Sequence, residues 1–381
     1  MECYKSYRFR LYPNDIQRSL IEKHFGATRY VYNYFLNIRK ETYLTSGQYY
    51  NYHDSALGLT KLKKSEGHIW LKEINSQCLQ SSLRHLESAY SKFFKKETQF
   101  PSYKSKKNRQ AFNVPQSVKI VTNKLFIPKF KKGISLTQHR DMSGNIISAT
   151  IIKESSGKYY VSILCKTQHN PFPKTNSKVG IDTGIKHIAI LSDGTTYSNI
   201  KPLKEKIKGI KYLQKRIGKG MDNSGSNAKK QLKLAIIHEK IKNKRIDHLQ
   251  KITTDIVKNH DVICIEDLAI KNMMKNHNLA QSFADVSIAQ FYNMLEYKCI
   301  WNDKELISID RYFPSSKMCS NCNYVNSSLK LSHRTWICTS CNQTHDRDVN
   351  ASINIKNQGL KIMSGLGTKS DNKQKQAEAS L

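Results

Sequence analysis

The chain has 381 residues, and its 63 Lys and Arg against 30 Asp and Glu give a net charge of +33 at pH 7. Hydrophobic residues make up 38% of it, enough to build cores, which excludes wholesale disorder. No apolar stretch is long enough to span a membrane, and cations are spread along nearly the whole chain, so nucleic acid is favoured over an anionic membrane surface as the partner.

The N-terminal residues alternate basic and aromatic side chains from residue 3 to residue 11, which predicts a strand. The same stretch lacks the apolar run of a signal peptide, so we expect the protein to stay in the cytosol. Asn14 then gives an N-cap signal for a basic helical segment that extends to residue 97. Its clearest helix covers about 75–96, where one apolar face carries Leu79, Leu83, Leu86, Ala89 and Phe93.

The pattern of apolar and polar residues changes at Phe100. Short apolar runs separated by turn residues follow: AFNV, VKIV, KLFIPKF, NIISATIIK and KYYVSILCK. This spacing predicts an all-β stretch, a small barrel or curled sheet, which the first strand is expected to rejoin. Residues 13–97 would then be an insertion, and residues 171–178 would be the linker that closes this half.

The second half has a different plan, in which strands alternate with helices. In chain order we expect a strand–turn–strand over 179–194, basic helices over 201–257 with a break at 222–227, a strand at 261–268, a helix at 285–304, a strand at 305–310, and a last helix from residue 349 with Gly359 past its end. This order predicts a layered α/β sheet whose first strands are antiparallel. Residues 360–381 lack periodicity and are expected to form a disordered tail.

Three acidic residues occupy special places in this plan. Asp182 lies within an otherwise apolar strand, Glu266 ends the next central strand, and Asp348 opens the last helix. A carboxylate at the rim of a buried strand is costly unless it is paired or bound to a cation. If they converge at the strand ends, the three acids would form a site for two Mg²⁺ ions that activate water against a phosphodiester.

Each acid also has a purely structural interpretation. Asp182 precedes a Thr–Gly turn, Glu266 and Asp267 could cap a following helix, and Asp348 could cap the last one. We favour Glu266 over Asp267 because it continues the inward-facing alternation of its strand. We favour Asp348 over Asp346 because its side chain is expected to cap the helix that faces the sheet edge, which leaves Asp346 toward solvent or behind the ligands.

Four of the nine cysteines form a CxxC–x15–CxxC pattern: Cys319, Cys322, Cys338 and Cys341. This spacing is typical of a four-thiolate zinc ribbon, and the closed ligand set predicts a structural ion. His333 and His345 are not needed as ligands and are expected at surface or substrate-side positions. Cys165 and Cys264 lie in apolar runs and are expected to be buried thiols.

Cations crowd the segment from Lys201 to Lys251 with few acids to offset them, which favours phosphate contacts over a merely solvated face. The residues that we expect to contact nucleic acid are Lys229, Lys230, Lys233, Lys240, Lys244 and Arg245. In the first half, aromatic and basic residues interleave in YKSYRFR, RYVYNYF and YSKFFKK. Some of these rings are candidates for base stacking, while many must belong to the core.

Four segments of the second half carry a family likeness: VGIDTGIKHIAILSDG, IEDLAIKNMMKNHNLAQSFAD, RYFPSSKMCSNC and HDRDVNASINI. They resemble the signatures of TnpB, the transposon-encoded RNA-guided DNA endonucleases related to compact type V CRISPR effectors. The segments FRLYPNDIQRSLIEKHFGATRYVYNYFL and PSYKSKKNRQAFNVPQ extend the likeness over nearly the entire chain, more loosely in the first half.

The resemblance implies a RuvC-type, RNase H-like nuclease domain, with Asp182, Glu266 and Asp348 as its catalytic, magnesium-binding acids and the four cysteines as its zinc ribbon. The implied domains are a wedge-like β-barrel (1–12 and 98–172), a helical recognition domain (13–97), the nuclease domain (173–313 and 345–359), the ribbon (314–344) and the tail (360–381).

The resemblance also implies partners and a place in the cell. The partners are a guide RNA copied from the transposon end and a double-stranded DNA target beside a short motif, and the place is the bacterial or archaeal cytosol, near the nucleoid. Diffuse cations suit such a protein, because base pairing reads the sequence while the protein holds the heteroduplex by its shape and backbone.

Three other functions stay open from the sequence alone. A guide-independent, structure-specific nuclease would keep the same core but carry no equimolar RNA. An RNA-guided DNA-binding regulator without cleavage would be signalled by the loss of one acid, whereas all three are present. A DNA-joining transposase would be exposed by strand transfer.

Overall fold

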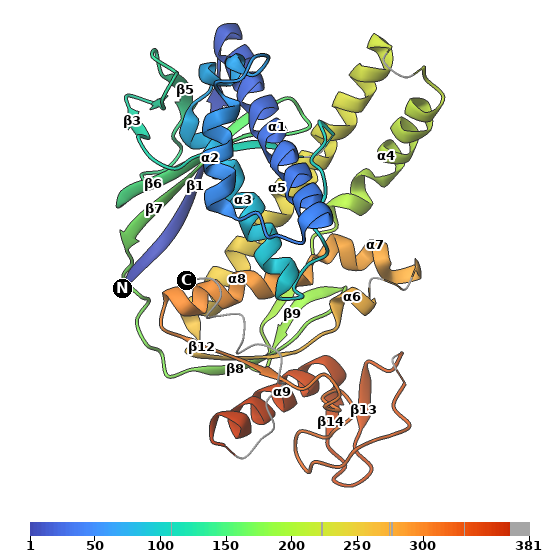
Figure 1. Ribbon diagram of the computed structural model, residues 1–381. Coiled ribbons are helices and arrows are strands. Elements are labelled where there is room, and N and C mark those ends of the chain that lie inside the picture. The colour runs from blue at the N-terminus through green and yellow to red at the C-terminus, as the bar shows by residue number, and fades with distance from the viewer. Residues whose placement is uncertain (108, 222–223, 274, 276, 331, 366–381) are drawn as a thin grey trace. The chain divides into compact units, whose positions relative to one another are not determined.

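The computed structural model describes the chain except residues 108, 222–223, 274, 276, 331 and 366–381 (Figure 1). The chain forms two compact units, one from residue 2 to residue 169 and one that holds Met1 and the chain from residue 170 onward. Among the described helices, none is both long enough and apolar enough to cross a membrane.

The first unit is built on a seven-stranded sheet in the order β2-β6-β7-β1-β5-β4-β3. In the middle, β1 (Glu2–Tyr12) pairs antiparallel with β7, from Glu2 opposite Gln168 to Leu11 opposite Tyr159. The other strands are β2 (Gln110–Val114), β3 (Lys119–Val121), β4 (Lys124–Phe126), β5 (Ile134–Thr137), β6 (Asn145–Lys153) and β7 (Tyr159–Gln168). Because β2 and β3 are the edges of the described sheet, the barrel expected from the sequence is a half-barrel.

The alternation of β1 explains why it occupies the middle of the sheet. Tyr7, Phe9 and Leu11 point into one core and are almost fully buried, while the basic residues between them point the other way. Ile21 and Phe25 of the following helix join the same core.

Four helical elements follow β1 in this unit: α1 (Asp15–Ser46), α2 (Tyr52–Leu62), the 3-10 turn η1 (Ile69–Glu73) and α3 (Ser76–Phe94). The predicted start of α1 is confirmed, because Asn14 forms a capping box with Gln17. The predicted apolar face of α3 is also confirmed, since Leu79, Leu83 and Leu86 are fully buried against α1 and α2.

The second unit holds a five-stranded sheet in the order β10-β9-β8-β11-β12. Its strands are β8 (Lys178–Asp182), β9 (His187–Leu191), β10 (Thr196–Ser198), β11 (Val262–Glu266) and β12 (Glu305–Ile309). The pairs β8–β9 and β9–β10 are antiparallel, whereas β8–β11 and β11–β12 are parallel. The sheet is therefore mixed, with the antiparallel strands first, as the order of elements predicts.

Helices cover both faces of this sheet (Figure 1). The helices of the unit are α4 (Pro202–Gly218), α5 (Gly225–Asn259), α6 (Ile270–Met273), α7 (His277–Val286), α8 (Ile288–Trp301) and α9 (Arg347–Met363). Ile181 and Ile265 point from the strands toward α5 and α8, whereas Cys264 points toward α9. Cys165 and Cys264 are both fully buried, as expected.

The end of α9 differs from the expectation. The helix continues through Gly359 to Met363 and is capped by Ser364, so Gly359 is not its terminator. Gly359 is instead needed for close packing, because a Cβ there would collide with the Cys264 side chain. The predicted tail therefore begins with helical residues, and residues 366–381 of it lie outside the described chain.

Candidate functional site

Asp182 and Glu266 lie at the same level on neighbouring parallel strands. The register of β8 and β11 places Ile181 opposite Ile265, and the two acids are the next residue of each strand. Since side chains alternate along a strand, Asp182 shares a face with Gly180 and Glu266 shares a face with Cys264. Both acids therefore point to the face of the sheet that α9 covers.

Gly180 brings α9 against this face. A Cβ at Gly180 would collide with the backbone of Ser352 and Lys356, so only glycine permits the observed approach. Asp348 lies one turn before Ser352, in the first turn of α9. The helix therefore runs from its contact with Gly180 toward Asp182. The three acids that the sequence singles out thus lie near one face of the sheet, close enough for the charges of Glu266 and Asp348 to act on Asp182.

The surroundings of Asp182 and Glu266 raise the pKa values of these two acids. Burial, followed by the negative charges of Glu266 and Asp348, raises the pKa of Asp182 to about 8. Burial also raises the pKa of Glu266, although a hydrogen bond donated by the Ser315 hydroxyl acts in the opposite direction. Among the described residues, neither Asp182 nor Glu266 has an ion-pair partner, so the site favours an added cation.

The expected capping role of Asp348 is wrong. The N-cap of α9 is Asp346, whose Oδ1 accepts hydrogen bonds from the backbone N–H groups of Asp348 and Val349, both at 3.0 Å. Asp346 is one residue before the helix and has the extended backbone that a cap requires, whereas Asp348 is already helical. The side chain of Asp348 is free of that role and is bound by two arginines.

Those arginines are Arg334 and Arg347. Arg347 lies 3.0 Å from Asp348 Oδ1, and Arg334 lies 3.1 Å from Oδ2. Sequence reasoning missed both arginines and Ser315. Arg334 and Ser315 reach their acids from other segments and follow no spacing rule, and Arg347, although adjacent to Asp348 in the chain, carries no sequence signal for this pairing. Asp267, the neighbour of Glu266, is occupied elsewhere, in an ion pair with Arg311.

A buried tyrosine lies beneath the acids. The Tyr292 hydroxyl and the Thr183 hydroxyl are 3.0 Å apart, and Thr183 directly follows Asp182. Burial raises the pKa of Tyr292, so this hydroxyl stays neutral beside the acids. The contact holds the end of β8 on α8.

The four predicted cysteines form one cluster. One sulfur from each of Cys319, Cys322, Cys338 and Cys341 lies within 4.8 Å of the others. Two contacts join the CxxC motifs, with Cys322 Sγ 3.5 Å from Cys338 Sγ and Cys319 Sγ 3.7 Å from Cys341 Sγ. The second motif lies on a hairpin of β13 (Thr335–Ile337) and β14 (Thr344–Asp346). Four soft donors around one point fit a tetrahedral metal ion.

The expectation for His345 is wrong, because this residue is buried rather than at a surface. It lies on β14 opposite Trp336, with ring centroids 4.9 Å apart, and its Nε2 is 3.0 Å from Cys319 Sγ. A ring N–H at that place can donate a hydrogen bond to the sulfur and so support a metal-bound thiolate. His333, in contrast, is exposed as expected.

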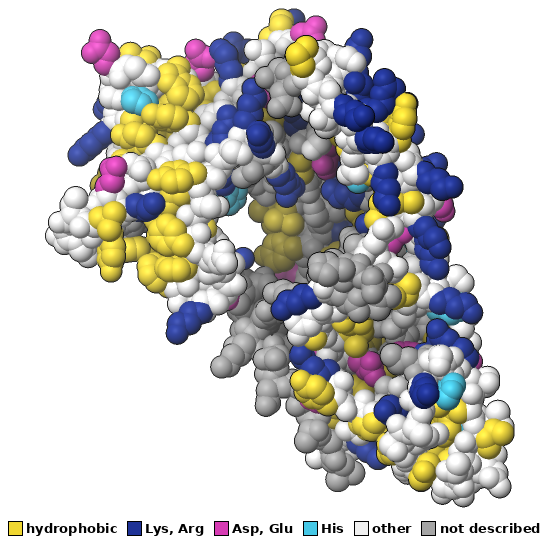
Figure 2. Space-filling model, turned by 90° about the vertical axis from the view of Figure 1, so that its right-hand side faces the viewer, with side chains coloured by type: hydrophobic (Ala, Val, Ile, Leu, Met, Phe, Trp, Pro, Cys, Tyr) yellow, Lys and Arg dark blue, Asp and Glu magenta, His cyan; other side chains and the backbone are white. Residues whose placement is uncertain are grey.

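The predicted nucleic-acid contacts lie on α5. Lys229, Lys233, Lys240 and Lys244 are exposed and Lys230 is half-buried. Arg245 differs from them, because it forms a largely buried ion pair with Asp285 at 2.8 Å. Figure 2 shows Lys and Arg side chains over much of the face that it draws, with few acids between them.

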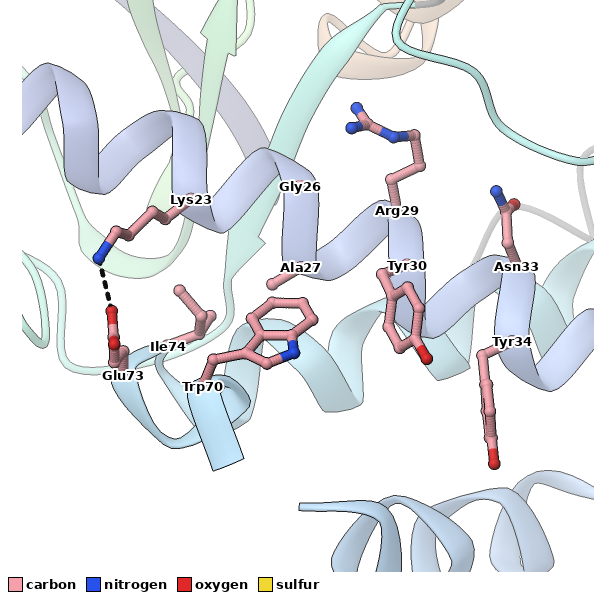
Figure 3. Close-up of a pocket in the computed structure, with 10 residues that line it drawn as sticks. All are labelled: Lys23, Gly26, Ala27, Arg29, Tyr30, Asn33, Tyr34, Trp70, Glu73 and Ile74. Carbon is pink, nitrogen blue, oxygen red and sulfur yellow. Dashed lines mark hydrogen bonds and ion pairs between the residues drawn. The ribbon is translucent and has the colours of Figure 1, made fainter. Parts of the chain in front are cut away.

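The first unit contains a separate cavity of about 660 Å³ along α1 (Figure 3). Its walls include the rings of Tyr30, Tyr34 and Trp70, and the Tyr30 and Trp70 ring centroids are 5.6 Å apart. At its rim, Lys23 is paired with Glu73 at 2.7 Å. The two tyrosines belong to the RYVYNYF segment, so part of that segment does present rings to a cavity, while Tyr32 and Phe35 belong to the core.

Family profiles match three segments of the chain. Residues 289–355 match "Cas12f1-like, TNB domain", residues 162–277 match "Probable transposase", and residues 1–48 match "Helix-turn-helix domain". The first two segments hold the three acids and the four cysteines. The third corresponds in the structure to strand β1 followed by the single helix α1.

Two curated relatives match nearly the full chain. A Streptomyces pristinaespiralis protein named "Putative RNA-guided DNA endonuclease" is 35% identical over 360 residues, covering 93% of this chain and 89% of the relative. "Putative RNA-guided DNA endonuclease InsQ" of Escherichia coli (strain K12) is 30% identical over 381 residues, covering 95% of this chain and 94% of the relative.

Among solved structures, the "Cas12f1-sgRNA-target DNA complex" has a similar fold. It matches with a TM-score of 0.52 at 13% identity, over 93% of this chain and 99% of that one.

Proposed function

Because the chain belongs to the TnpB family of transposon-encoded RNA-guided DNA endonucleases, we propose that it hydrolyses DNA phosphodiester bonds at Asp182, Glu266 and Asp348. The observation that carries the assignment is the convergence of these acids on one sheet face, where burial and mutual repulsion raise the pKa of Asp182 to about 8. A fold that holds like charges together in this way is expected to bind a cation there.

The donor set fits magnesium. Carboxylate oxygens are hard ligands, and Asp182 and Glu266 have no ion-pair partner among the described residues, so the acids supply the charge that such an ion needs. When bound, a pair of Mg²⁺ ions would lower the pKa of a coordinated water and stabilise the leaving oxygen of the phosphodiester. The chain's own part is to hold the three carboxylates at fixed positions and to keep Asp182 and Glu266 partly away from water.

Other side chains orient the acids. The Ser315 hydroxyl donates to Glu266 and fixes one of its oxygens. Arg334 and Arg347 balance the charge of Asp348, and Arg334 is 61% exposed, so it can also contact the phosphate of a bound strand. The Tyr292–Thr183 contact holds the backbone next to Asp182.

The architecture supports a RuvC-type assignment for this unit. Antiparallel strands first, then parallel ones, with acids on β8, β11 and the first turn of α9, are consistent with a nuclease domain of residues 173–313 and 345–359. We propose that the four cysteines hold a structural Zn²⁺ in residues 314–344, because four thiolates leave no open position for substrate. In the first unit, the proposal assigns a wedge role to 1–12 and 98–172 and a recognition role to 13–97.

The proposed partners are a guide RNA and a double-stranded DNA target. The two relatives carry RNA-guided DNA endonuclease in their names, and the Cas12f1 complex holds an sgRNA and target DNA. A net charge of +33 supports the same partners, since it supplies phosphate contacts without sequence preference.

The test is cleavage of a matched target by the purified protein with its copurifying RNA and Mg²⁺. Asp182→Asn, Glu266→Gln and Asp348→Asn should each reduce cleavage more than about a hundredfold, because loss of an outer partner of a metal ligand alone costs about 10- to 100-fold. RNA and target binding should survive in all three variants.

The matched control is Asp346→Asn, because asparagine caps a helix as well as aspartate does. This variant should cut at the wild-type rate. Wild-type cleavage by any of the three acid variants would contradict the site. Cleavage that needs no RNA would indicate a structure-specific nuclease instead, and target binding without cleavage by the wild type would indicate a regulator.

A further inference from the structure

Two asparagines on α9 are buried without touching either proposed metal site. Asn350 and Asn354 lie one turn apart on one face of the helix, and each is only 1% exposed. Burial of a primary amide is unfavourable unless its hydrogen bonds are replaced, so these residues are expected to have specific partners.

Their partners are in one short loop, residues 315–320, which connects β12 to the first cysteine pair. Asn350 Nδ2 donates to Met318 O at 2.7 Å, and its Oδ1 accepts from the Ser320 N–H at 2.9 Å. Asn354 Nδ2 donates to Met318 O at 2.6 Å and to Ser315 O at 2.8 Å. The two amides thus hold the loop backbone on α9 by hydrogen bonds to three main-chain groups, Ser315 O, Met318 O and the Ser320 N–H.

The fastened loop belongs to both proposed sites. Cys319, between Met318 and Ser320, supplies one of the four clustered sulfurs. Ser315 donates its hydroxyl hydrogen to Glu266. The helix to which the loop is bonded, α9, carries Asp348 two residues before Asn350.

We propose that Asn350 and Asn354 are positioning residues that couple the cysteine site to the acid site. The inference rests on the proposed function. A metal ion that gathers the four sulfurs fixes Cys319 and therefore the loop; the amides transmit this fixed position to the first turn of α9, and Ser315 transmits it to Glu266. Metal occupancy at the cysteines then sets how well the acids are spaced for their own ions, since such sites tolerate displacements of only about 0.5 Å.

A purely packing role would not need amides. Leucine has the same branched arrangement of heavy side-chain atoms as asparagine and suits a buried helix face, yet both residues use their amide groups on main-chain atoms of the same loop. The variants Asn350→Leu and Asn354→Leu therefore remove these hydrogen bonds while the branched shape of the side chain is kept.

The matched control is Asn302→Leu. Asn302 is 3% exposed, lies in the same unit, donates from Nδ2 to Lys298 O at 2.8 Å and accepts from the Phe172 N–H at 3.1 Å. It therefore has the same chemistry and similar burial, and both of these partners lie outside the loop 315–320. Thermal unfolding of all variants measures how much general stability each one loses.

The experiment measures Mn²⁺ binding to the full chain, freed of nucleic acid by salt and nuclease treatment, with Asp182→Asn as the reference for binding outside the acid site. Asn350→Leu and Asn354→Leu should weaken the Asp182-dependent affinity about 10- to 100-fold, the effect of losing an outer partner. Asn302→Leu should change it less than about twofold. Wild-type protein stripped of zinc and dialysed free of chelator should show the same weakening, reversed by added zinc.

Two results would overturn the coupling. One is an unchanged Asp182-dependent Mn²⁺ affinity in the Asn350 and Asn354 variants or in zinc-free wild type. The other is an equal loss in Asn302→Leu, which would reduce the effect to general stability. If wild type and Asp182→Asn bind Mn²⁺ alike, the acid site itself is wrong, and the coupling falls with it.

Discussion

The surroundings of Asp182 act strongly on its side chain. Its pKa is about 8 in the fold against 3.8 for an unperturbed aspartate, because burial and two neighbouring carboxylates disfavour its charge. A carboxyl whose pKa is higher in the folded chain stabilises the fold at low pH. This contribution is complete below about pH 4 and is lost as the pH rises toward 8.

Magnesium should therefore stabilise the protein most where Asp182 is charged. At pH 8, an ion at 100 times its Kd should add about 2.7 kcal/mol to the free energy of unfolding of wild type. Asp182→Asn should gain much less, since it loses a ligand. Thermal unfolding at pH 6 and pH 8 with and without Mg²⁺, in buffer without chelator so that the cysteine site keeps its metal, measures both effects. An equal gain in the two proteins would argue against the site.

His345 offers a second test at the scale of one side chain. His345→Phe keeps a ring on Trp336 but removes the nitrogen that lies 3.0 Å from Cys319 Sγ. Loss of this outer contact should accelerate zinc release to a chromophoric chelator about 10- to 100-fold.

Two further variants serve as controls for the His345→Phe experiment. His333→Phe changes an exposed histidine of the same segment and should leave the release rate unchanged. Cys338→Ser removes a ligand and should lower the zinc content itself. Full zinc occupancy in Cys338→Ser would refute the four-thiolate site, and an unchanged release rate in His345→Phe would refute the supporting contact.

At the scale of elements, the packing of α9 on β8 determines where Asp348 lies. Gly180→Ala would press a Cβ against the backbone of Ser352 and Lys356, which has no side-chain freedom to yield. The free energy of unfolding should fall by about 1–3 kcal/mol, the usual range for overpacking, and Mg²⁺ affinity should fall with it. Gly209→Ala on α4 is the control: no atom lies within 4 Å of its Cβ, so it should stabilise the helix by about 0.5–1 kcal/mol. Urea unfolding compares them, and equal effects would contradict the packing argument.

The same elements show what sequence patterns can and cannot predict. Alternation along the strand predicts that Glu266 points with Cys264 to the face that α9 covers. The spacing of apolar residues predicts which face of α3 is buried. These patterns depend on neighbours in sequence. The capping of α9 by Asp346 depends on where the helix begins, to within one residue, and a pattern cannot resolve that difference.

The partners of the acids depend on tertiary structure alone. Ser315 and Arg334 come from segments separated from Glu266 and Asp348 by loops, so only the folded chain brings them together. His345 was expected at a surface or substrate-side position because the four cysteines need no further ligand, and the cysteine cluster instead supplies the partner that allows its burial.

At the scale of the whole molecule, the charge of +33 governs association with polyanions. Exposed lysines of α5 are expected to contact phosphates, so replacing Lys229, Lys233 and Lys240 by Gln should weaken nucleic-acid binding for all sequences alike. The dependence of the logarithm of affinity on the logarithm of salt concentration should become shallower by about 0.9 for each lost contact with duplex DNA.

The control for location replaces the same number of lysines that lie outside α5 and are already paired: Lys23 with Glu73, Lys166 with Glu2 and Lys174 with Asp303. Both triple variants lose the same charge, so a difference between them isolates the α5 surface. Titrations from 50 to 300 mM salt measure the slopes, and equal slopes would show that only net charge matters.

The central place of β1 in its sheet has a consequence for synthesis. Its main partner, β7, leaves the ribosome last in the unit, since Glu2 pairs with Gln168. At roughly 5–20 residues per second, β1 waits roughly 8–30 s for that partner, while the helices made in between fold through local contacts. During this delay Tyr7, Phe9 and Leu11 have no sheet to cover them. Arg8 and Arg10, placed between these apolar residues, are expected to keep the unpaired strand from aggregating, as charged residues that flank apolar strand positions do.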